Sequence, residues 1–173
     1  MEGRIVKVVF VNFSTLMNPK LQKYFLIGIL FLSLNIYGQS GIKIQCDDSL
    51  WNQVYHSYRL KILEKCKLVT GIVVGARFEA DGDAHILIKL DTLQENLLYP
   101  MNYEKQGGNL VAEPVCATLI NEKNPKTECD GYVNNVYLPQ LGEHVEIIGT
   151  YVLDTKHSWS EIHPVTSIKL IKK

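Results

Sequence analysis

The chain has 173 residues, a length that leaves room for no more than one ordinary domain once its N-terminal part is removed. It contains 18 Lys and Arg and 18 Asp and Glu residues, so its formal net charge is zero. Four of the basic residues but only one acidic residue precede Gly41, so Gly41–Lys173 carries 14 basic and 17 acidic residues and a net charge of −3. A mildly acidic domain lacks the positive surface expected of a general nucleic-acid-binding protein.

Residues 1–40 are interpreted as a leader. Lys20 and Lys23 precede an apolar run at 24–36, and small or polar residues follow it. This order is typical of a secretory signal peptide, and the run is short for a membrane span, which needs roughly 20 apolar residues. We place the signal peptide at about 17–40, with cleavage near Ser40, and interpret residues 1–16 as an extension from a misplaced start codon. The alternative is that Ile5–Phe13 forms a strand. The mature protein is expected to be exported, periplasmic or secreted, with no membrane span.

All four cysteines, Cys46, Cys66, Cys116 and Cys129, lie in the mature part. An even number in an exported chain favours two disulfides, and the sequence alone allows three pairings. We favour the local pairs Cys46–Cys66 and Cys116–Cys129, each worth roughly 3 kcal/mol in the chain-entropy model. A zinc site built from these cysteines is the rival, but the sequence has no C-x-x-C pair.

The mature chain begins with a predicted helical segment at 41–66. Asp47, Asp48 and Ser49 form a helix start signal. Apolar residues then recur at three- and four-residue steps, which predicts a helix from about Ser49 to Glu64. These residues are Leu50, Trp51, Val54, Tyr55, Tyr58 and Ile62.

From Lys67 onward the apolar period changes to two, the period of a strand. We expect strands from Lys67 to Phe78, from Ala84 to Asp91, from about Leu110 to Leu119, from His144 to Asp154 and from Trp159 to Leu170. Asp81-Gly82-Asp83 predicts a hairpin turn. In the second strand, Ile86, Ile88 and Leu90 are expected to face inward, and His85, Leu87 and Lys89 outward. Residues 92–109 are interpreted as a long polar connection, Pro114 indicates an edge position or a bulge, and residues 121–138 are interpreted as irregular.

This pattern predicts a mainly β fold: a five-stranded, OB-like closed barrel at 67–173 with an N-terminal capping helix. An SH3-like barrel is the open alternative. Three segments carry a resemblance: D-G-D-x-H-I at 81–86, G-E-x-V-E-I-x-G-x-Y-V-x-D at 142–154 and H-x-W-x-E-I-H-P at 157–164. With them, the chain resembles small exported OB-fold-like bacterial proteins of unknown function over most of 66–169. The resemblance supports the fold and implies no functional residues.

The densest polar chemistry lies between Gly149 and Lys169. Four polar or aromatic residues occupy every second position there, which places them on one face of a strand, with Ser160, Ile162, Pro164, Thr166 and Ile168 toward the core. In an OB-fold, the loops between strands one and two and between strands four and five border the ligand-binding face. The candidate ligand-binding residues from these loops are Asp81, Asp83, His85, His157, Trp159, Glu161 and His163.

Three interpretations compete for this surface. As a metal site, His85, His157 and His163 with Glu161 or Asp83 would suit zinc, although the histidine spacing matches no known motif. As a binding surface, Trp159 would stack on a sugar or base while neighbouring polar groups form hydrogen bonds. In a purely structural interpretation, the same residues pack over the barrel end and shape the turns.

Binding is the predicted function, with an oligosaccharide, a peptide or another small polymer as ligand. A metal-dependent hydrolase that uses Glu161 and His163 is one alternative, and a protein-interaction domain is another. The sequence has no G-x-S-x-G, H-E-x-x-H or P-loop motif, and the mature part contains only two arginines, Arg59 and Arg77. These absences favour a domain without enzymatic activity.

Overall fold

The computed structural model describes residues 44–117 and 127–172. The leader predicted for residues 1–40 lies outside these residues. The described part contains five strands in one sheet: β1 (Leu60–Phe78), β2 (Ala84–Leu90), β3 (Leu110–Ala112), β4 (His144–Asp154) and β5 (Trp159–Leu170). The prediction of a mainly β domain with five strands is confirmed, and the bounds of the fourth and fifth strands are those expected.

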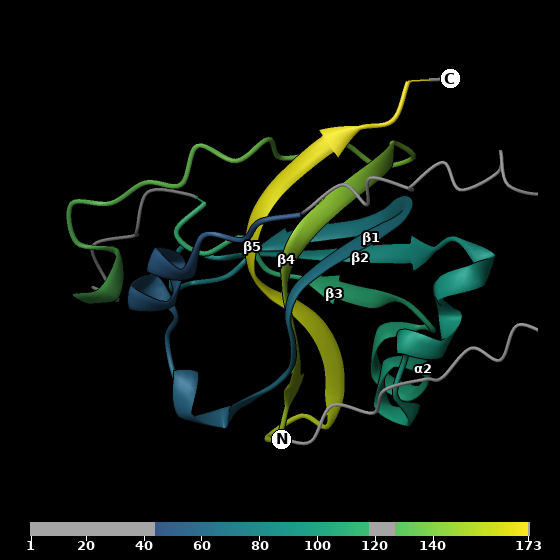
Figure 1. The fold of residues 1–173 in the computed structure, drawn as a ribbon, viewed down its shortest axis with the longest axis horizontal. Helices are drawn as coiled ribbons and strands as arrows, with labels where there is room; N and C mark the ends of the chain where they lie inside the picture. The colour runs from purple at the N-terminus through teal and green to yellow at the C-terminus, as the bar shows by residue number, and fades with distance from the viewer. Residues whose placement is uncertain (1–43, 118–126, 173) are drawn as a thin grey trace, which may run out of the picture. The chain divides into compact units, whose positions relative to one another are not determined.

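The five strands pair in the order β1-β2-β3-β5-β4, and β4 pairs with β1, so the sheet closes on itself as a barrel (Figure 1). All pairs are antiparallel except β3 with β5, which is parallel. Strand β1 has 19 residues, and its first part pairs with β4 while its last part pairs with β2. The exchange of partners occurs at Gly71, where a Cβ would collide with the carbonyl oxygen of Lys89. Glycine is therefore needed for the close approach of the two strands.

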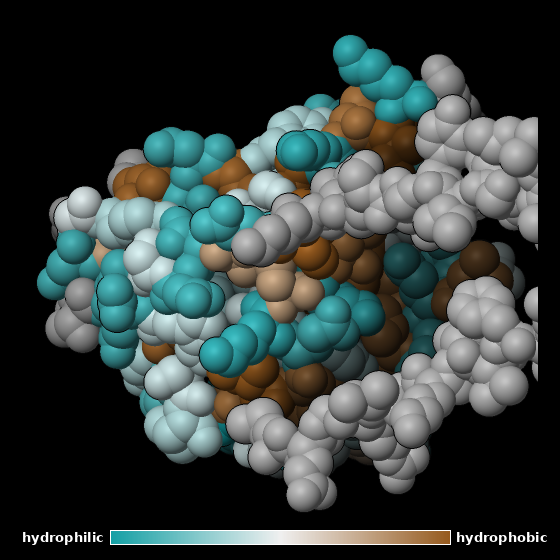
Figure 2. Space-filling view, in the orientation of Figure 1, coloured by the Kyte–Doolittle hydropathy of each residue, from teal (hydrophilic) through white to brown (hydrophobic). Residues whose placement is uncertain are grey.

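Alternating apolar residues of the strands fill the barrel. Its most deeply buried side chains include Val69, Ile88, Leu110, Ile147 and Ile162. A second apolar cluster lies around Leu50, Val54, Leu60, Val115 and Val152, with Cys116 and Cys129 among them. Some apolar side chains remain exposed, among them Ile62, Ile72, Val74 and Phe78 of β1. The space-filling view accordingly shows hydrophobic patches between hydrophilic side chains (Figure 2).

Both disulfides form as predicted. Cys46 bonds to Cys66 and Cys116 bonds to Cys129, with Cα–Cα distances of 5.5 and 5.6 Å. The first ties the segment before η1 (Asp48–Gln53) to β1, and the second ties the segment after β3 to η4 (Thr127–Cys129). Two disulfides indicate an oxidising environment.

The predicted helix from Ser49 to Glu64 is wrong. The chain instead forms two short 3-10 helices, η1 and η2 (Ser57–Arg59), and β1 already begins at Leu60. His56 between them has a left-handed backbone with φ of 56°, which interrupts any helix. Leu60 and Ile62 pair with Asp154 and Val152 of β4, so strand pairing prevails over the helical spacing. The start signal itself is confirmed, because the Asp47 side chain accepts a hydrogen bond from the Ser49 N–H at 2.9 Å.

The polar connection at 92–109 contains two helices that the sequence analysis missed, η3 (Thr92–Leu97) and α2 (Pro100–Gln106). Pro100 at the first helical position and Gly107 with φ of 63° after the last are the usual boundary residues of a helix. Helix α2 lies beside β3 in Figure 1. Strand β3 is shorter than expected and ends before Pro114, which cannot donate to a ladder. Residues 118 and 119 of the predicted strand and residues 121–126 of the predicted irregular stretch lie outside the described residues.

The ladder between β4 and β5 shifts at Gly149, and this shift decides which side chains enter the core. A Cβ on Gly149 would lie 2.5 Å from Ile162 Cγ2 and 2.5 Å from the Pro164 carbonyl oxygen. Beyond the shift, Val165 enters the core, where Thr166 was expected, and Thr166 is only half-buried. Pro164 and Ile168 are buried as predicted. Ser160 and Ile162 are buried as predicted.

Gly149→Ala should lower the free energy of unfolding by about 1–3 kcal/mol, because backbone and a packed side chain must both move. The matched control is Gly75→Ala, where the nearest atom is the movable Leu87 Cδ1 at 3.1 Å. Urea unfolding of both variants checks this expectation. Equal losses in the two variants would contradict the importance of the close approach at Gly149.

Candidate functional site

A pocket of about 280 Å³ lies where the β1–β2 and β4–β5 connections meet. Gly82 with φ of 92° lies in the first connection, and Ser158 with φ of 65° lies in the second. The first is the hairpin turn expected at 81–83, closed by the Glu79 N–H, which donates to the Asp83 carbonyl at 2.8 Å. The lining residues are Tyr55, Arg59, Arg77, Glu79, Asp81, Asp83, His85, Glu113, Asp154, His157, Trp159 and His163.

Six of the seven residues predicted from the two loops line this pocket: Asp81, Asp83, His85, His157, Trp159 and His163. The seventh, Glu161, is buried and contacts both Trp159 and His163. His85 was expected to face outward on β2, yet it is only 2% exposed because Glu113, Gln106 and Trp159 cover it.

Strand register brings β2, β3 and β5 together at the inner end of the pocket. Ile86 of β2 pairs with Ala112 of β3, and Ala112 pairs in parallel with Ile162 of β5. The Glu113 N–H donates to the Ile162 carbonyl at 2.9 Å, and the Val165 N–H donates to the Glu113 carbonyl at 3.3 Å. The parallel pairing therefore extends to Glu113 and places its side chain between those of β2 and β5.

The Glu113 cluster, defined as His85, Glu113, Glu161 and His163, results from this register. Glu113 Oε1 lies 2.7 Å from His85 Nδ1, and Glu113 Oε2 lies 3.0 Å from His163 Nδ1. His163 Nδ1 also lies 3.1 Å from Glu161 Oε1. Three of these side chains are at most 2% exposed and Glu113 is 12% exposed, so the cluster is a buried chain of charged and polar groups.

Burial opposes the charged forms of Glu113, Glu161 and His163, and the contacts of these three side chains decide which of them ionise. Burial alone would raise the pKa of Glu113, but hydrogen bonds with His163 and His85 outweigh it and hold the pKa well below its usual range. Burial also opposes a charged His163, yet hydrogen bonds to Glu113 and Glu161 raise the pKa of His163 to about 10. Burial and the charge of Glu113 raise the pKa of Glu161. Glu113 and His163 thus form a buried ion pair next to a carboxyl group that resists ionisation.

His157, Trp159, Glu161 and His163 share one face as predicted, because each contacts the next. The rings of His157 and Trp159 stack with centroids 4.3 Å apart, and Trp159 Nε1–H donates to Glu161 Oε2 at 2.8 Å. His157 Nδ1 lies 2.9 Å from Asp154 Oδ2, which also pairs with Arg59 Nε at 3.1 Å. His157 therefore belongs to a separate ion-pair group at the start of the β4–β5 turn.

Asn102 of α2 holds the start of β5 in place. Its side-chain amide donates to the Ser160 carbonyl at 2.9 Å, and its oxygen accepts from the Ser160 N–H and hydroxyl, each at 2.9 Å. Asn102 is fully buried, so these bonds lie where water does not compete. With Ser160 fixed, the neighbouring side chains of Trp159 and Glu161 are directed to the pocket side.

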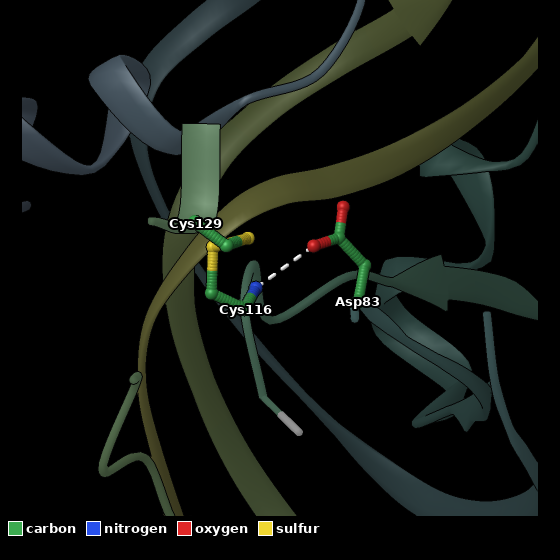
Figure 3. A group of neighbouring side chains, drawn as sticks. All are labelled: Asp83, Cys116 and Cys129. Carbon is green, nitrogen blue, oxygen red and sulfur yellow. Dashed lines mark hydrogen bonds between the residues drawn. A yellow bond between two sulfur atoms is a disulfide. The ribbon is translucent and has the colours of Figure 1, made fainter. Parts of the chain in front are cut away.

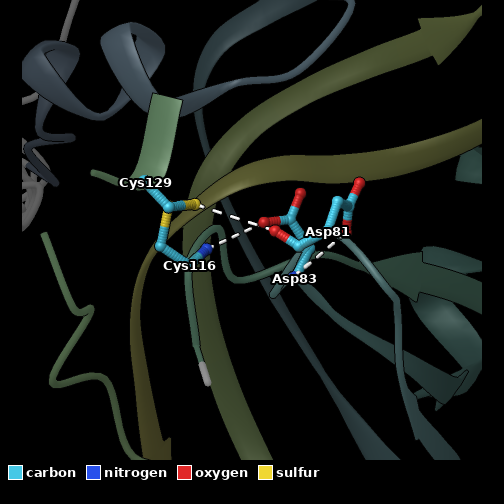
Figure 4. Close-up of a disulfide and its surroundings, with 4 residues drawn as sticks. All are labelled: Asp81, Asp83, Cys116 and Cys129. Atoms are coloured by element: carbon cyan, nitrogen blue, oxygen red, sulfur yellow. Dashed lines mark hydrogen bonds between the residues drawn. A yellow bond between two sulfur atoms is a disulfide. The ribbon is translucent and has the colours of Figure 1, made fainter. Parts of the chain in front are cut away.

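Asp83 joins the pocket to the second disulfide. Its Oδ1 accepts a hydrogen bond from the Cys116 N–H at 2.8 Å (Figure 3). The sulfur of Cys129 lies 3.8 Å from the Asp81 carbonyl oxygen (Figure 4). Asp83, Cys116 and Cys129 lie close enough together to suggest a metal site. The two sulfurs are bonded to each other, however, so neither is a thiolate that could bind a metal.

The metal ligands predicted from the sequence are only partly brought together. Glu161 and His163 lie side by side, and their ligand atoms and those of Glu113 lie within 4.8 Å of one another. His85 instead contacts the other oxygen of Glu113, and His157 is engaged by Asp154.

Sequence reasoning missed the other six pocket residues, which are Tyr55, Arg59, Arg77, Glu79, Glu113 and Asp154. Asp154 ends a clearly predicted strand next to the turn, and that position could have identified it. Glu113 carried no comparable signal.

No protein-family model matches the sequence, and no curated protein matches it significantly. The resemblance to small exported OB-fold-like proteins therefore stays a prediction. Among the described residues, no helix combines the length and apolar character needed to cross a membrane.

The raised pKa of His163 predicts that stability falls at alkaline pH. In the unfolded chain a histidine titrates near about 6.5, whereas folded His163 titrates at about 10. Its stabilising contribution is therefore complete below pH ~6.5 and is lost as the pH rises toward about 10. The free energy of unfolding, measured by urea titration in EDTA, should fall across this interval, with a flatter profile for His163→Gln.

The control for this experiment is His56→Asn, since asparagine also tolerates the left-handed backbone found at that position. The free energy of unfolding of this variant should fall with pH as steeply as that of the parent protein. A parent profile as flat as that of His163→Gln would contradict the ion pair between His163 and Glu113.

Proposed function

We propose that the protein is an exported binding domain that holds the end of an oligosaccharide in the pocket between its β1–β2 and β4–β5 connections. The proposal includes export through the leader at 17–40 and an OB-like barrel. The long, glycine-containing β1 and the extended connection between β3 and β4 support the OB-like description. The two disulfides support export.

One observation carries this proposal: residues from both connections line a single pocket around Trp159. A saccharide is bound by an aromatic face together with charged groups that form hydrogen bonds with its hydroxyls. The pocket offers such groups in the carboxylates of Glu79 and Asp81 and the guanidinium of Arg77. With a net charge of −3 for residues 41–173, a nucleic acid is the less favoured polymer.

The size and the inner wall of the pocket are also consistent with a bound ligand. Its volume of about 280 Å³ is close to the lower limit of small-molecule sites, about 300 Å³, and suits the end of a polymer rather than a long segment. His163 borders the pocket, and its buried Nε2 has no hydrogen-bond partner among the described residues. A buried polar atom of this kind is normally satisfied by a ligand or an ordered water.

A glycan array followed by calorimetry with the best-bound glycan tests the proposal. We expect Trp159→Ala to weaken binding about tenfold or more, the factor that corresponds to ~1.4 kcal/mol. Trp159→Phe should lose less, because it keeps an aromatic face and removes only the indole N–H. Tyr103→Ala, at an exposed aromatic residue of α2 outside the pocket lining, is the matched control and should bind as the parent does.

Two outcomes would contradict the proposal. One is that the folded protein binds no glycan on the array, in which case a peptide library becomes the next screen. The other is that Trp159→Ala and Tyr103→Ala bind the glycan equally well, which would place its binding site elsewhere.

A metal-dependent hydrolase at the same pocket is the second candidate. The observation that favours it is the contact between Glu161, whose pKa is raised, and His163, since such a pair can transfer protons. Release of new reducing ends from a bound glycan, lost in Glu161→Gln, would support hydrolysis. Binding without turnover in the metal-loaded protein would leave binding alone as the function.

A further inference from the structure

We infer that the inner end of the pocket binds a divalent transition-metal ion, with Zn²⁺ the best match, through His163 Nδ1, Glu161 Oε1 and Glu113 Oε2. This inference rests on the proposed function in one respect, because the metal ion would bind in the same pocket as the proposed oligosaccharide. It differs from the metal site expected from the sequence, since Glu113 takes the place of His85 and His157 as a ligand.

The His163 nitrogen lies at close to metal-site spacing from both carboxylates, and the ligand atoms of all three residues lie within 4.8 Å of one another. His163 Nδ1 lies 3.0 Å from Glu113 Oε2 and 3.1 Å from Glu161 Oε1. Ligands at about 2.0–2.2 Å from a tetrahedral zinc ion lie about 3.3–3.6 Å from one another. An expansion of a few tenths of an ångström would therefore admit the ion, which is within the reach of small side-chain rotations.

The outer oxygens of both carboxylates are already held by other side chains. Trp159 Nε1–H donates to Glu161 Oε2 at 2.8 Å, and His85 Nδ1 lies 2.7 Å from Glu113 Oε1. Ligating carboxylates in metal sites are oriented by hydrogen bonds of this kind. These partners, Trp159 of β5 and His85 of β2, belong to the sheet, so the sheet itself holds both ligating carboxylates in orientation.

Charge balance gives an independent argument. Oxygens of Glu113 and Glu161 both approach His163 Nδ1, so two buried acceptors share the single proton on that nitrogen. Buried charges are paired or coordinate a metal. A divalent cation that displaces both the proton of His163 Nδ1 and the proton of the Glu161 carboxyl group would balance two carboxylates, and His163 would be neutral, the form in which imidazole binds a metal.

The donor set selects the class of metal. One imidazole nitrogen and two carboxylate oxygens suit zinc and its neighbours, whereas Ca²⁺ and Mg²⁺ prefer sites made only of oxygen. Three protein ligands leave the fourth tetrahedral position open. Since Glu113 and His163 border the pocket, that position is available to a pocket ligand or to water.

The test measures zinc binding by the mature protein. The full chain is expressed and exported, and the purified protein is treated with EDTA to remove bound metal before zinc is added. Elemental analysis should give about one zinc per chain after dialysis against Zn²⁺, and calorimetry should show much weaker binding of Mg²⁺. We expect Glu113→Gln and Glu161→Gln to weaken zinc binding more than about 100-fold, and His85→Gln to weaken it about 10–100-fold, as is usual for residues that orient a ligand.

Two matched controls separate this ligand set from other sets of ligands that the pocket residues could form. His157→Gln and Glu79→Gln change pocket residues outside the set and should bind zinc as the parent does. Circular dichroism verifies that each variant is folded. Should the glutamine variants not fold, the parent protein loaded with Co²⁺ provides a second test. Tetrahedral Co²⁺ absorbs visible light intensely, whereas octahedral Co²⁺ absorbs it only weakly.

Absence of zinc binding by the folded parent would overturn the inference, as would undiminished zinc binding by Glu113→Gln and Glu161→Gln. Glycan calorimetry, carried out both in EDTA and with the zinc-loaded protein, keeps this result separate from the proposed function. Glycan binding without zinc binding would refute the metal site alone. Zinc binding without glycan binding would support the metal site and contradict the proposed function.

Discussion

The constraint on which the site depends is the burial of the Glu113 carboxylate between two histidines of different strands. A buried carboxylate is costly unless it is paired and hydrogen-bonded. Glu113 meets this requirement through His85 of β2 and His163 of β5, at 2.7 and 3.0 Å. The short β3 and its parallel pairing with β5 are needed for this contact, because they bring Glu113 to the level of His163. The inner end of the pocket is therefore a product of strand register.

The outer part of the pocket is built differently, from two tight turns held by local contacts. Asp83 is fixed to the Cys116 backbone, next to the second disulfide. Asp154 accepts hydrogen bonds from the N–H groups of Lys156 and His157 and pairs with Arg59. A polar rim of hydrogen-bonded turns around Trp159, with a buried cluster of ionisable groups behind it, suits recognition of a small polar ligand better than it suits a flat protein interface.

The sequence predicted those parts of the fold that depend on local patterns. The period of two at 144–154 and 159–170 identified β4 and β5 with their observed bounds, and the turn at Gly82 followed from its composition. The predicted helix at 49–64 failed because pairing of β1 with β4, a long-range interaction, outweighed its spacing. Glu113 was missed for the same reason. Its importance arises from a parallel pairing with a strand far away in the chain, and no local period reports which strands are neighbours.

The free energy of unfolding of Glu113→Gln tests the central claim most directly. Measured in EDTA against Glu64→Gln, which changes an exposed partner of Lys67, it isolates the value of the buried carboxylate. Loss of one partner from a buried ion pair costs about 3 kcal/mol or more, whereas loss of an exposed pair costs ~1 kcal/mol or less. We expect the two variants to differ in this way. Equal losses, both ~1 kcal/mol or less, would contradict the view that Glu113 organises the inner end of the pocket.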